Sequence, residues 1–136
     1  MISDALEQIL QELYADARAR SYEMITLEQL LLALLEQSDE VQKVLEALHV
    51  DVDVLSGQLL SSIQDNTPML PAGLLDKTDT QPTLGFQRVM QRAIIHAQSV
   101  EKREVRPVDV LVSMMGEKDC PAVYFLQLQS VGRVEI

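Results

Sequence analysis

The side chains with the most obvious potential for chemistry are two pairs of carboxylates at corresponding places in the chain. Glu23 precedes Thr26-Leu27-Glu28-Gln29, a segment that places Glu28 in the first turn of a predicted helix. Glu104 and Asp109 occupy the matching places 81 residues later. A carboxylate in a first helical turn usually balances the helix dipole and the free amides there. The other interpretation is that these acids recognise a basic partner, and their spacing alone leaves both interpretations open.

The side chains that could ligate a soft metal or act as a nucleophile are few and scattered. His49, His96 and Cys120 share no metal-ligand spacing, and the sequence has no His-Glu-x-x-His, Cys-x-x-Cys or phosphate-binding glycine motif. We expect His49 to end a helix, His96 to edge a buried helix face and Cys120 to start a helix. The sequence therefore predicts a binding protein with no catalytic residue, metal or cofactor. A small enzyme or metal protein built on these three side chains is the alternative that metal analysis would test.

The composition limits the classes of partner. The chain has 136 residues, 47% of them hydrophobic, and 11 basic against 21 acidic side chains give a net charge of −10. Such a chain is predicted to be globular and to repel nucleic acids, anionic membranes and its own copies, so we expect a monomer that binds basic protein surfaces. One cysteine excludes an internal disulfide and fits a reducing cytoplasm. The sequence shows no signal peptide and no apolar stretch of about 18 residues that could span a membrane.

Helical periodicity and capping residues predict the elements that position these side chains. Apolar spacing predicts a helix over residues 3–21, with Asp4 as its cap. Thr26-Leu27-Glu28-Gln29 is a capping box that opens a second helix, which is apolar nearly all round and therefore central. Ser38 and Asp51 are placed to cap a third and a fourth helix.

The second half of the chain repeats the first. The apolar positions of the first helix recur 80 residues later, from Phe86 to Ala97, and those of the second and third helices recur at a spacing of 81. Residues 1–65 and 83–136 thus form two repeats, and the proline-containing segment 66–82 is predicted to be a connecting loop. We expect one all-α domain over residues 1–136, a tandem pseudo-symmetric repeat of two units of about four helices. Because the second repeat reaches Ile136 before its fourth helix, we expect a short last helix or a longer native chain.

Two segments resemble a known family. Glu23 to Leu34 and Asp79 to Val89 resemble the N-terminal domain of Clp ATPases, and Thr67 to Pro71 points to the ClpA type within that family. The resemblance covers essentially the whole chain. It implies a domain attached to two ATPase modules that unfold proteins and deliver them to the ClpP protease in the bacterial cytoplasm. The domain itself would bind protein substrates and the adaptor ClpS without hydrolysing ATP.

The resemblance also implies which residues contact the adaptor. The acidic contacts of the family correspond to Glu23 and Glu28, and a threonine near the start of the fifth helix corresponds to Thr83. The related ClpC branch binds phosphorylated arginine through two Thr-Glu-His segments. Here Gln29 and Val110 stand where those histidines would be, which disfavours a ClpC-like phosphoarginine-binding domain. A stand-alone Clp-repeat regulator acting in trans is the other alternative, and a reading frame that continues into ATPase motifs would exclude it.

Overall fold

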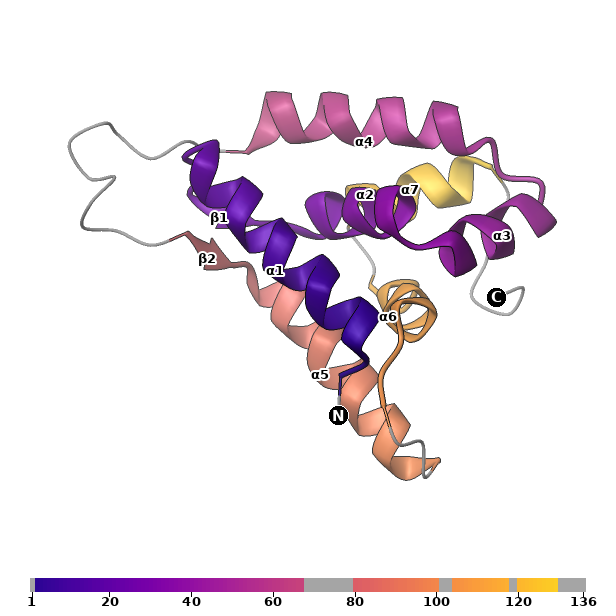
Figure 1. Cartoon of the computed structure of the whole chain (residues 1–136). Helices are drawn as coiled ribbons and strands as arrows, with labels where there is room; N and C mark the ends of the chain where they lie inside the picture. Colours follow the sequence, from indigo (N-terminus) through magenta and orange to yellow (C-terminus); the bar gives the residue numbers. More distant parts are fainter. Residues whose placement is uncertain (1, 68–79, 101–103, 118–119, 130–136) are drawn as a thin grey trace.

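The computed structural model describes residues 2–67, 80–100, 104–117 and 120–129, and this part of the chain has an all-α fold. The helices are α1 (Asp4–Ala19), α2 (Leu27–Gln37), α3 (Asp39–Ala47), α4 (Val52–Asn66), α5 (Leu84–Ser99), α6 (Pro107–Met114) and α7 (Pro121–Leu128). Two short strands, β1 (Met24–Ile25) and β2 (Gln81–Pro82), accompany them (Figure 1). No described helix is long and apolar enough to cross a membrane.

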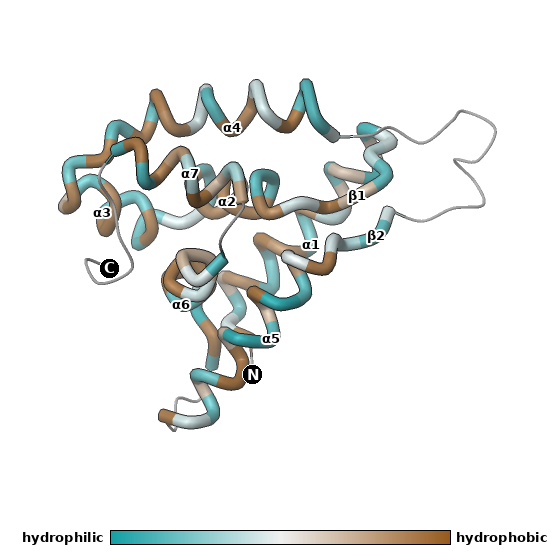
Figure 2. Tube along the Cα trace, turned by 180° about the vertical axis from the view of Figure 1, so that it is seen from behind, coloured by the Kyte–Doolittle hydropathy of each residue, from teal (hydrophilic) through white to brown (hydrophobic). Residues whose placement is uncertain are grey.

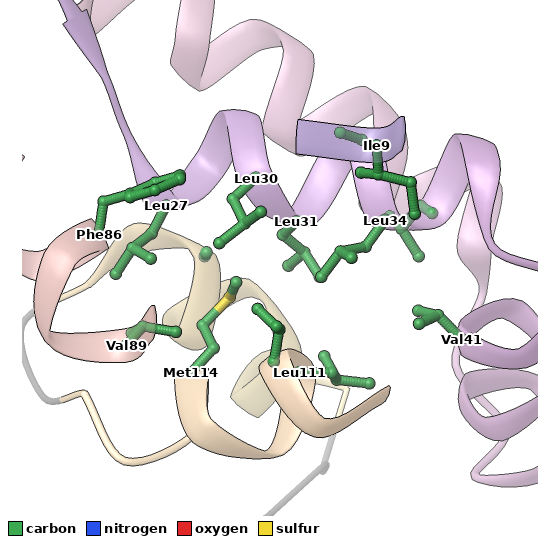
Figure 3. Close-up of a cluster of buried hydrophobic side chains, with 14 of the residues drawn as sticks. Ile9, Leu27, Leu30, Leu31, Leu34, Val41, Phe86, Val89, Leu111 and Met114 are labelled. Carbon is green, nitrogen blue, oxygen red and sulfur yellow. The ribbon is translucent and has the colours of Figure 1, made fainter. Parts of the chain in front are cut away.

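The central element is α2, as its apolar sequence predicts. Leu30, Leu31 and Leu34 are fully buried, and α2 contacts each of the other six helices. Figure 3 shows these leucines together with Leu111 and Met114 of α6, which come from the second half of the chain. By contrast, the outer helices α1, α4 and α5 alternate hydrophobic and hydrophilic residues along their length (Figure 2). The two halves of the sequence therefore share one core.

The strands are an addition to the all-helical prediction. Met24 pairs in parallel with Gln81, and Ile25 with Pro82. Next to this pair, the buried Thr80 donates its hydroxyl hydrogen to the carbonyl oxygen of Tyr22 at 2.7 Å. The predicted connection 66–82 is thus shorter at both ends, because Asn66 belongs to α4 and Gln81–Pro82 to β2. Its middle, residues 68–79, lies outside the described part of the chain.

The internal repeat has a different register from the one that the sequence predicts. The N-caps of α2 and α6 are Thr26 and Arg106, which are 80 residues apart and not 81. Leu30 and Leu31 are fully buried, and so are Val110 and Leu111 at that spacing. Between α3 and α7 the buried positions Val41 and Leu45 match Ala122 and Leu126 at a spacing of 81. The extra residue therefore falls after α6, whereas the sequence prediction put it in the turn before that helix.

Backbone hydrogen bonds follow the same symmetry. The Thr83 amide donates to the Ile25 carbonyl at 3.0 Å, and the Ser3 amide donates to the Val105 carbonyl at 2.9 Å. Ser3 also corrects the predicted cap of α1: its Oγ accepts from the Leu6 amide, while Asp4 is already the first helical residue. The fourth helix expected for the second repeat would fall in residues outside the described part.

Candidate functional site

A hollow of about 300 Å³ lies where α2, α5 and α7 begin. The parallel β1–β2 pair places the starts of α2 and α5 side by side. The start of α7 completes the lining with Cys120 and Pro121. Free amides and the positive ends of helix dipoles make such a place favourable for carboxylates. The hollow is lined by Thr26, Leu27, Glu28, Thr83, Gly85, Arg88, Glu117, Cys120 and Pro121.

The structure brings two of the three predicted contact residues into this hollow. Glu28 lines it from α2 and Thr83 lines it from the start of α5. Glu23 is exposed and does not line the hollow, but its carbonyl oxygen accepts from the Gln81 amide at 3.2 Å. Glu23 is thus tied to the segment that leads directly into Thr83, on the same edge of the molecule.

Two threonines hold the helix starts that surround the hollow. The Oγ1 atom of Thr26 accepts from the Gln29 amide at 3.3 Å, and that of Thr83 accepts from the Phe86 amide at 3.2 Å. Each hydroxyl is then occupied as an acceptor of a capping bond and keeps a hydrogen that it can donate. The predicted capping box at Thr26 is only half formed, since the side chain of Gln29 does not bond to the Thr26 amide and its Nε2 donates to the Met24 carbonyl instead.

The lining of the hollow also includes an ionic cluster that sequence reasoning missed. The buried carboxylate of Glu117 accepts from Arg88 at 2.7 Å and from Arg92 at 3.0 Å. The Arg88 hydrogen bond, followed by those of Arg92 and the positive charge of both arginines, holds the pKa of Glu117 below its usual range despite burial. Arg88 nevertheless keeps 58% of its side chain exposed. The hollow therefore offers a carboxylate, hydroxyl groups and the outer face of a guanidinium.

Cys120 is the N-cap residue of α7, which confirms the predicted position at a helix start. Its Sγ lies 4.0 Å from Oε1 of Glu28. Burial raises the pKa of the thiol, and the negative charge of Glu28 raises it further. An attacking thiol needs the opposite shift, so Cys120 is placed as part of the wall and not as an activated nucleophile.

The two histidines lie away from the hollow. His49 follows α3 with a left-handed backbone (φ 65°), close to its predicted place at the end of that helix. His96 is in the last turn of α5, two helical turns after the buried Val89, so it lies at the edge of the buried face as predicted. Its side chain is exposed and adds nothing to the core. Among the described residues, no group of three or more His, Cys, Asp or Glu side chains could hold a metal ion.

The repeat creates a second hollow of about 360 Å³ with different chemistry. Ser3 and Pro107 line it in the places of Thr83 and Leu27, but Arg106 replaces Thr26. The Arg106 guanidinium lies 3.2 Å from Glu40, and the Asp109 carboxylate accepts from the Arg106 amide at 2.9 Å. Asp109 therefore caps α6, as the helix-dipole interpretation predicts, whereas Glu28 caps no helix and lines its hollow.

Comparisons with known proteins relate nearly all of the chain to one family. Residues 1–129 match the family described as Clp repeat (R) N-terminal domain. The chain is similar to a ClpA homolog protein of Fuscovulum blasticum, with 40% identity over 133 residues that cover 98% of this chain and 16% of that protein. The chain therefore spans about a sixth of that relative's length.

Solved structures of low identity share the fold. The Hsp104 N-terminal domain from Candida albicans has a TM-score of 0.79 and 9% identity, covering 98% of this chain and 85% of that one. The N-terminal domain of the ClpV1 ATPase from E. coli has a TM-score of 0.79 and 19% identity, covering 98% and 80%. A complex of a ClpV N-domain with a VipB peptide has a TM-score of 0.66 and 18% identity, covering 84% and 67%.

Proposed function

Because the chain belongs to the family of Clp repeat N-terminal domains, we propose that it is the adaptor-docking domain of a ClpA-type unfoldase and binds ClpS at the hollow between α2, α5 and α7. The supporting observation is the convergence of Glu28 and Thr83 on one hollow, with Glu23 beside it. Thr83 is far from Glu23 and Glu28 in the sequence. The resemblance singles them out independently of their positions in space.

Charge supports a basic adaptor surface. The chain has a net charge of −10, and Glu23 and Glu28 lie on the same edge. Carboxylates on such an edge steer a basic partner and fix its orientation. We therefore expect the affinity for ClpS to fall as salt concentration rises, because partly exposed charge pairs are screened.

The asymmetry of the two hollows supports one adaptor per domain. In the second hollow the place of Thr26 is taken by Arg106, whose positive charge lies against Glu40. In the register of the structure, Val108 takes the place of Glu28. A surface that binds Glu28 and two threonine hydroxyls finds only the Ser3 hydroxyl as an equivalent there, so we expect a one-to-one complex.

The same proposal assigns the chain a place in a larger protein. We propose that ATPase modules attached to this domain unfold protein substrates and pass them to ClpP in the bacterial cytoplasm, while this domain contributes binding and no hydrolysis. The chain's coverage of 16% of its ClpA relative is consistent with such an arrangement. A flexible tether would raise the concentration of the docked adaptor near the ATPase modules.

The two alternative functions find less support. In the register of the structure, Gln29 and Asp109 take the places of the ClpC histidines. Gln29 is buried, and Asp109 carries a negative charge that disfavours a phosphate group. A regulator that acts in trans would have no attached ATPase modules. Sequencing the gene beyond the codon for Ile136 would decide between that regulator and an unfoldase domain.

Calorimetric titration with purified ClpS tests the proposal. The wild-type chain is expected to bind at a ratio of one to one, and Glu23→Lys combined with Glu28→Lys is expected to abolish binding. The matched control is Glu46→Lys combined with Asp53→Lys, which makes the same charge change at exposed positions of α3 and α4. An equal loss of ClpS binding in the control variant would show that the effect comes from net charge alone. Unchanged binding by a folded Glu23, Glu28 variant would place the adaptor elsewhere.

A further inference from the structure

Two exposed hydrophobic side chains border the hollow between α2, α5 and α7. Leu84 is the first residue of α5 and stands between Thr83 and Gly85, which both line the hollow. It is 72% exposed, the largest exposed fraction among the large hydrophobic side chains of the described residues. Tyr124 lies on α7 and is 57% exposed. An aliphatic and an aromatic side chain therefore face solvent close to the polar lining.

Helix geometry relates Tyr124 to the hollow. Pro121 is the first residue of α7 and lines the hollow, and Tyr124 follows it by three residues on the same helix face. Side chains on a helix lean toward its N-terminus, which directs Tyr124 back over the turn that borders the hollow. No residue of α7 is charged between Pro121 and Leu128. The exposed face of α7 is thus an apolar surface that begins at the edge of the hollow.

The hollow alone offers little of what gives protein interfaces their affinity. Its lining includes Glu28, the partly exposed Arg88 and the hydroxyl groups of Thr26 and Thr83. Charges at such exposed sites orient a partner and speed its association, but each contributes little to affinity. Most of the binding energy of an interface comes from a few apolar and aromatic side chains that the partner covers, and tyrosine is among the commonest of them.

We propose that Leu84 and Tyr124 are the apolar anchors of the adaptor interface. This inference rests on the proposed adaptor-docking function. The partner surface that fits this site carries a basic side chain near Glu28, flanked by apolar groups that cover Leu84 and Tyr124. A folded partner holds these groups at a fixed spacing. The apolar contacts then supply most of the affinity, and the charge at Glu28 supplies the orientation.

Calorimetric titration of variants with ClpS tests the anchors. Leu84→Ala and Tyr124→Ala are each expected to weaken binding about tenfold, because each removes apolar area that the adaptor would cover. Tyr124→Phe keeps the ring and is expected to bind within about twofold of wild type. The matched control is Ile95→Ala. Ile95 is 64% exposed on the same helix as Leu84 but about three turns farther from the hollow, so its replacement should leave the affinity unchanged.

Two further measurements separate apolar contacts from charged ones. Burial of apolar surface makes the heat capacity change of binding negative, so Leu84→Ala combined with Tyr124→Ala should make that change smaller. The loss of affinity in this double variant is expected to be the same at low and high salt. Glu28→Gln, by contrast, should weaken binding mainly at low salt, because salt screens the charge that it removes.

Each outcome decides the proposal. Wild-type affinity in both Leu84→Ala and Tyr124→Ala, or an equal loss in Ile95→Ala, would overturn it. If circular dichroism shows that Tyr124→Ala does not fold, Leu84→Ala and its Ile95→Ala control still decide.

The same titrations distinguish the anchors from the docking site itself. If Glu23→Lys combined with Glu28→Lys abolishes binding while the alanine variants bind as wild type does, the adaptor site stands and only the anchors are wrong. If the wild-type chain does not bind ClpS, both the adaptor site and its anchors are wrong.

Discussion

Glu28 and Asp109 look equivalent in the sequence, and the structure gives them different roles. The Asp109 carboxylate accepts from the backbone amide of Arg106 at the start of α6. Glu28 lines the hollow near Cys120, while the cap of α2 is supplied by Thr26. The difference arises from the register, since Asp109 is the third helical residue of α6 and Glu28 the second of α2. Only the third residue is placed to reach back to the N-cap amide.

The contact between Glu28 and Cys120 has a measurable consequence for the thiol. Burial and the Glu28 charge raise the Cys120 pKa, so the folded chain should alkylate more slowly than the unfolded chain at pH 8. Glu28→Gln removes the negative charge and is expected to move the midpoint of the rate-against-pH curve downward. Iodoacetamide kinetics across pH 7 to 10, with the urea-unfolded chain as control, measure this shift. Equal rates for the folded and unfolded chains would contradict the buried position.

Glu117 makes the stability of the domain depend on acid pH. Its pKa is lowered in the folded state, chiefly by the Arg88 hydrogen bond, so its contribution is present above the unfolded-state value near 4.5 and is lost as pH falls through the lowered value. Glu117→Gln should cost about 1 kcal/mol of unfolding free energy at pH 7, a small value because the paired arginines are partly exposed, and it should cost less at pH 2. Urea unfolding at both pH values tests this. If Glu117→Gln lowers the unfolding free energy equally at both pH values, the ion pairs of Glu117 contribute nothing to stability.

At the scale of elements, the helices were predictable and their contacts were less so. Capping residues such as Ser38 and Asp51 indicated the starts of α3 and α4, because a side-chain oxygen at an N-cap is a local signal. The β1–β2 pair escaped prediction because two-residue strands have no sequence period. The cluster of Glu117 with Arg88 and Arg92 also escaped, since its members lie on different elements and share no spacing.

Thr83 combines a structural role with its proposed contact to the adaptor, and two substitutions separate them. Thr83→Ala removes the cap that accepts from the Phe86 amide and should cost about 1 kcal/mol of unfolding free energy. Thr83→Ser keeps both the cap and the hydroxyl hydrogen, so it should retain stability and ClpS affinity. Chemical denaturation measures the first effect and calorimetry the second. An adaptor affinity that is unchanged in Thr83→Ala would remove Thr83 from the contact surface.

At the scale of the whole molecule, the repeat predicted one shared core but misplaced its register. A spacing of 81 would make Leu31 and Val112 equivalent positions of the two repeats. Leu31 is fully buried, whereas Val112 is only partly buried. Spacings of 80 and 81 both preserve an apolar pattern over a short helix. The caps, the burial of each position and the backbone hydrogen bonds at Ile25 and Val105 distinguish them. The positions of the two hollows, which depend on that register, were therefore beyond sequence reasoning.

A shared core predicts that both halves unfold together. Leu31→Ala removes a fully buried side chain from α2 and should cost about 3 kcal/mol. Tyrosine fluorescence can follow each half separately, because Tyr124→Phe leaves Tyr14 and Tyr22 as reporters of the first half, and Tyr14→Phe with Tyr22→Phe leaves Tyr124. We expect coincident transitions that Leu31→Ala shifts equally. Separate midpoints would show that the repeats fold as independent units.

The most direct test of the adaptor site is an amide NMR titration of the isotope-labelled chain with unlabelled ClpS. The account predicts that the largest changes in chemical shift fall on residues 23–28 and 80–88, with Cys120 among them and with small changes at Arg106 and Asp109. Saturation at one equivalent of ClpS would agree with a single functional hollow. Shifts concentrated at the second hollow would contradict the account and place the adaptor on another face.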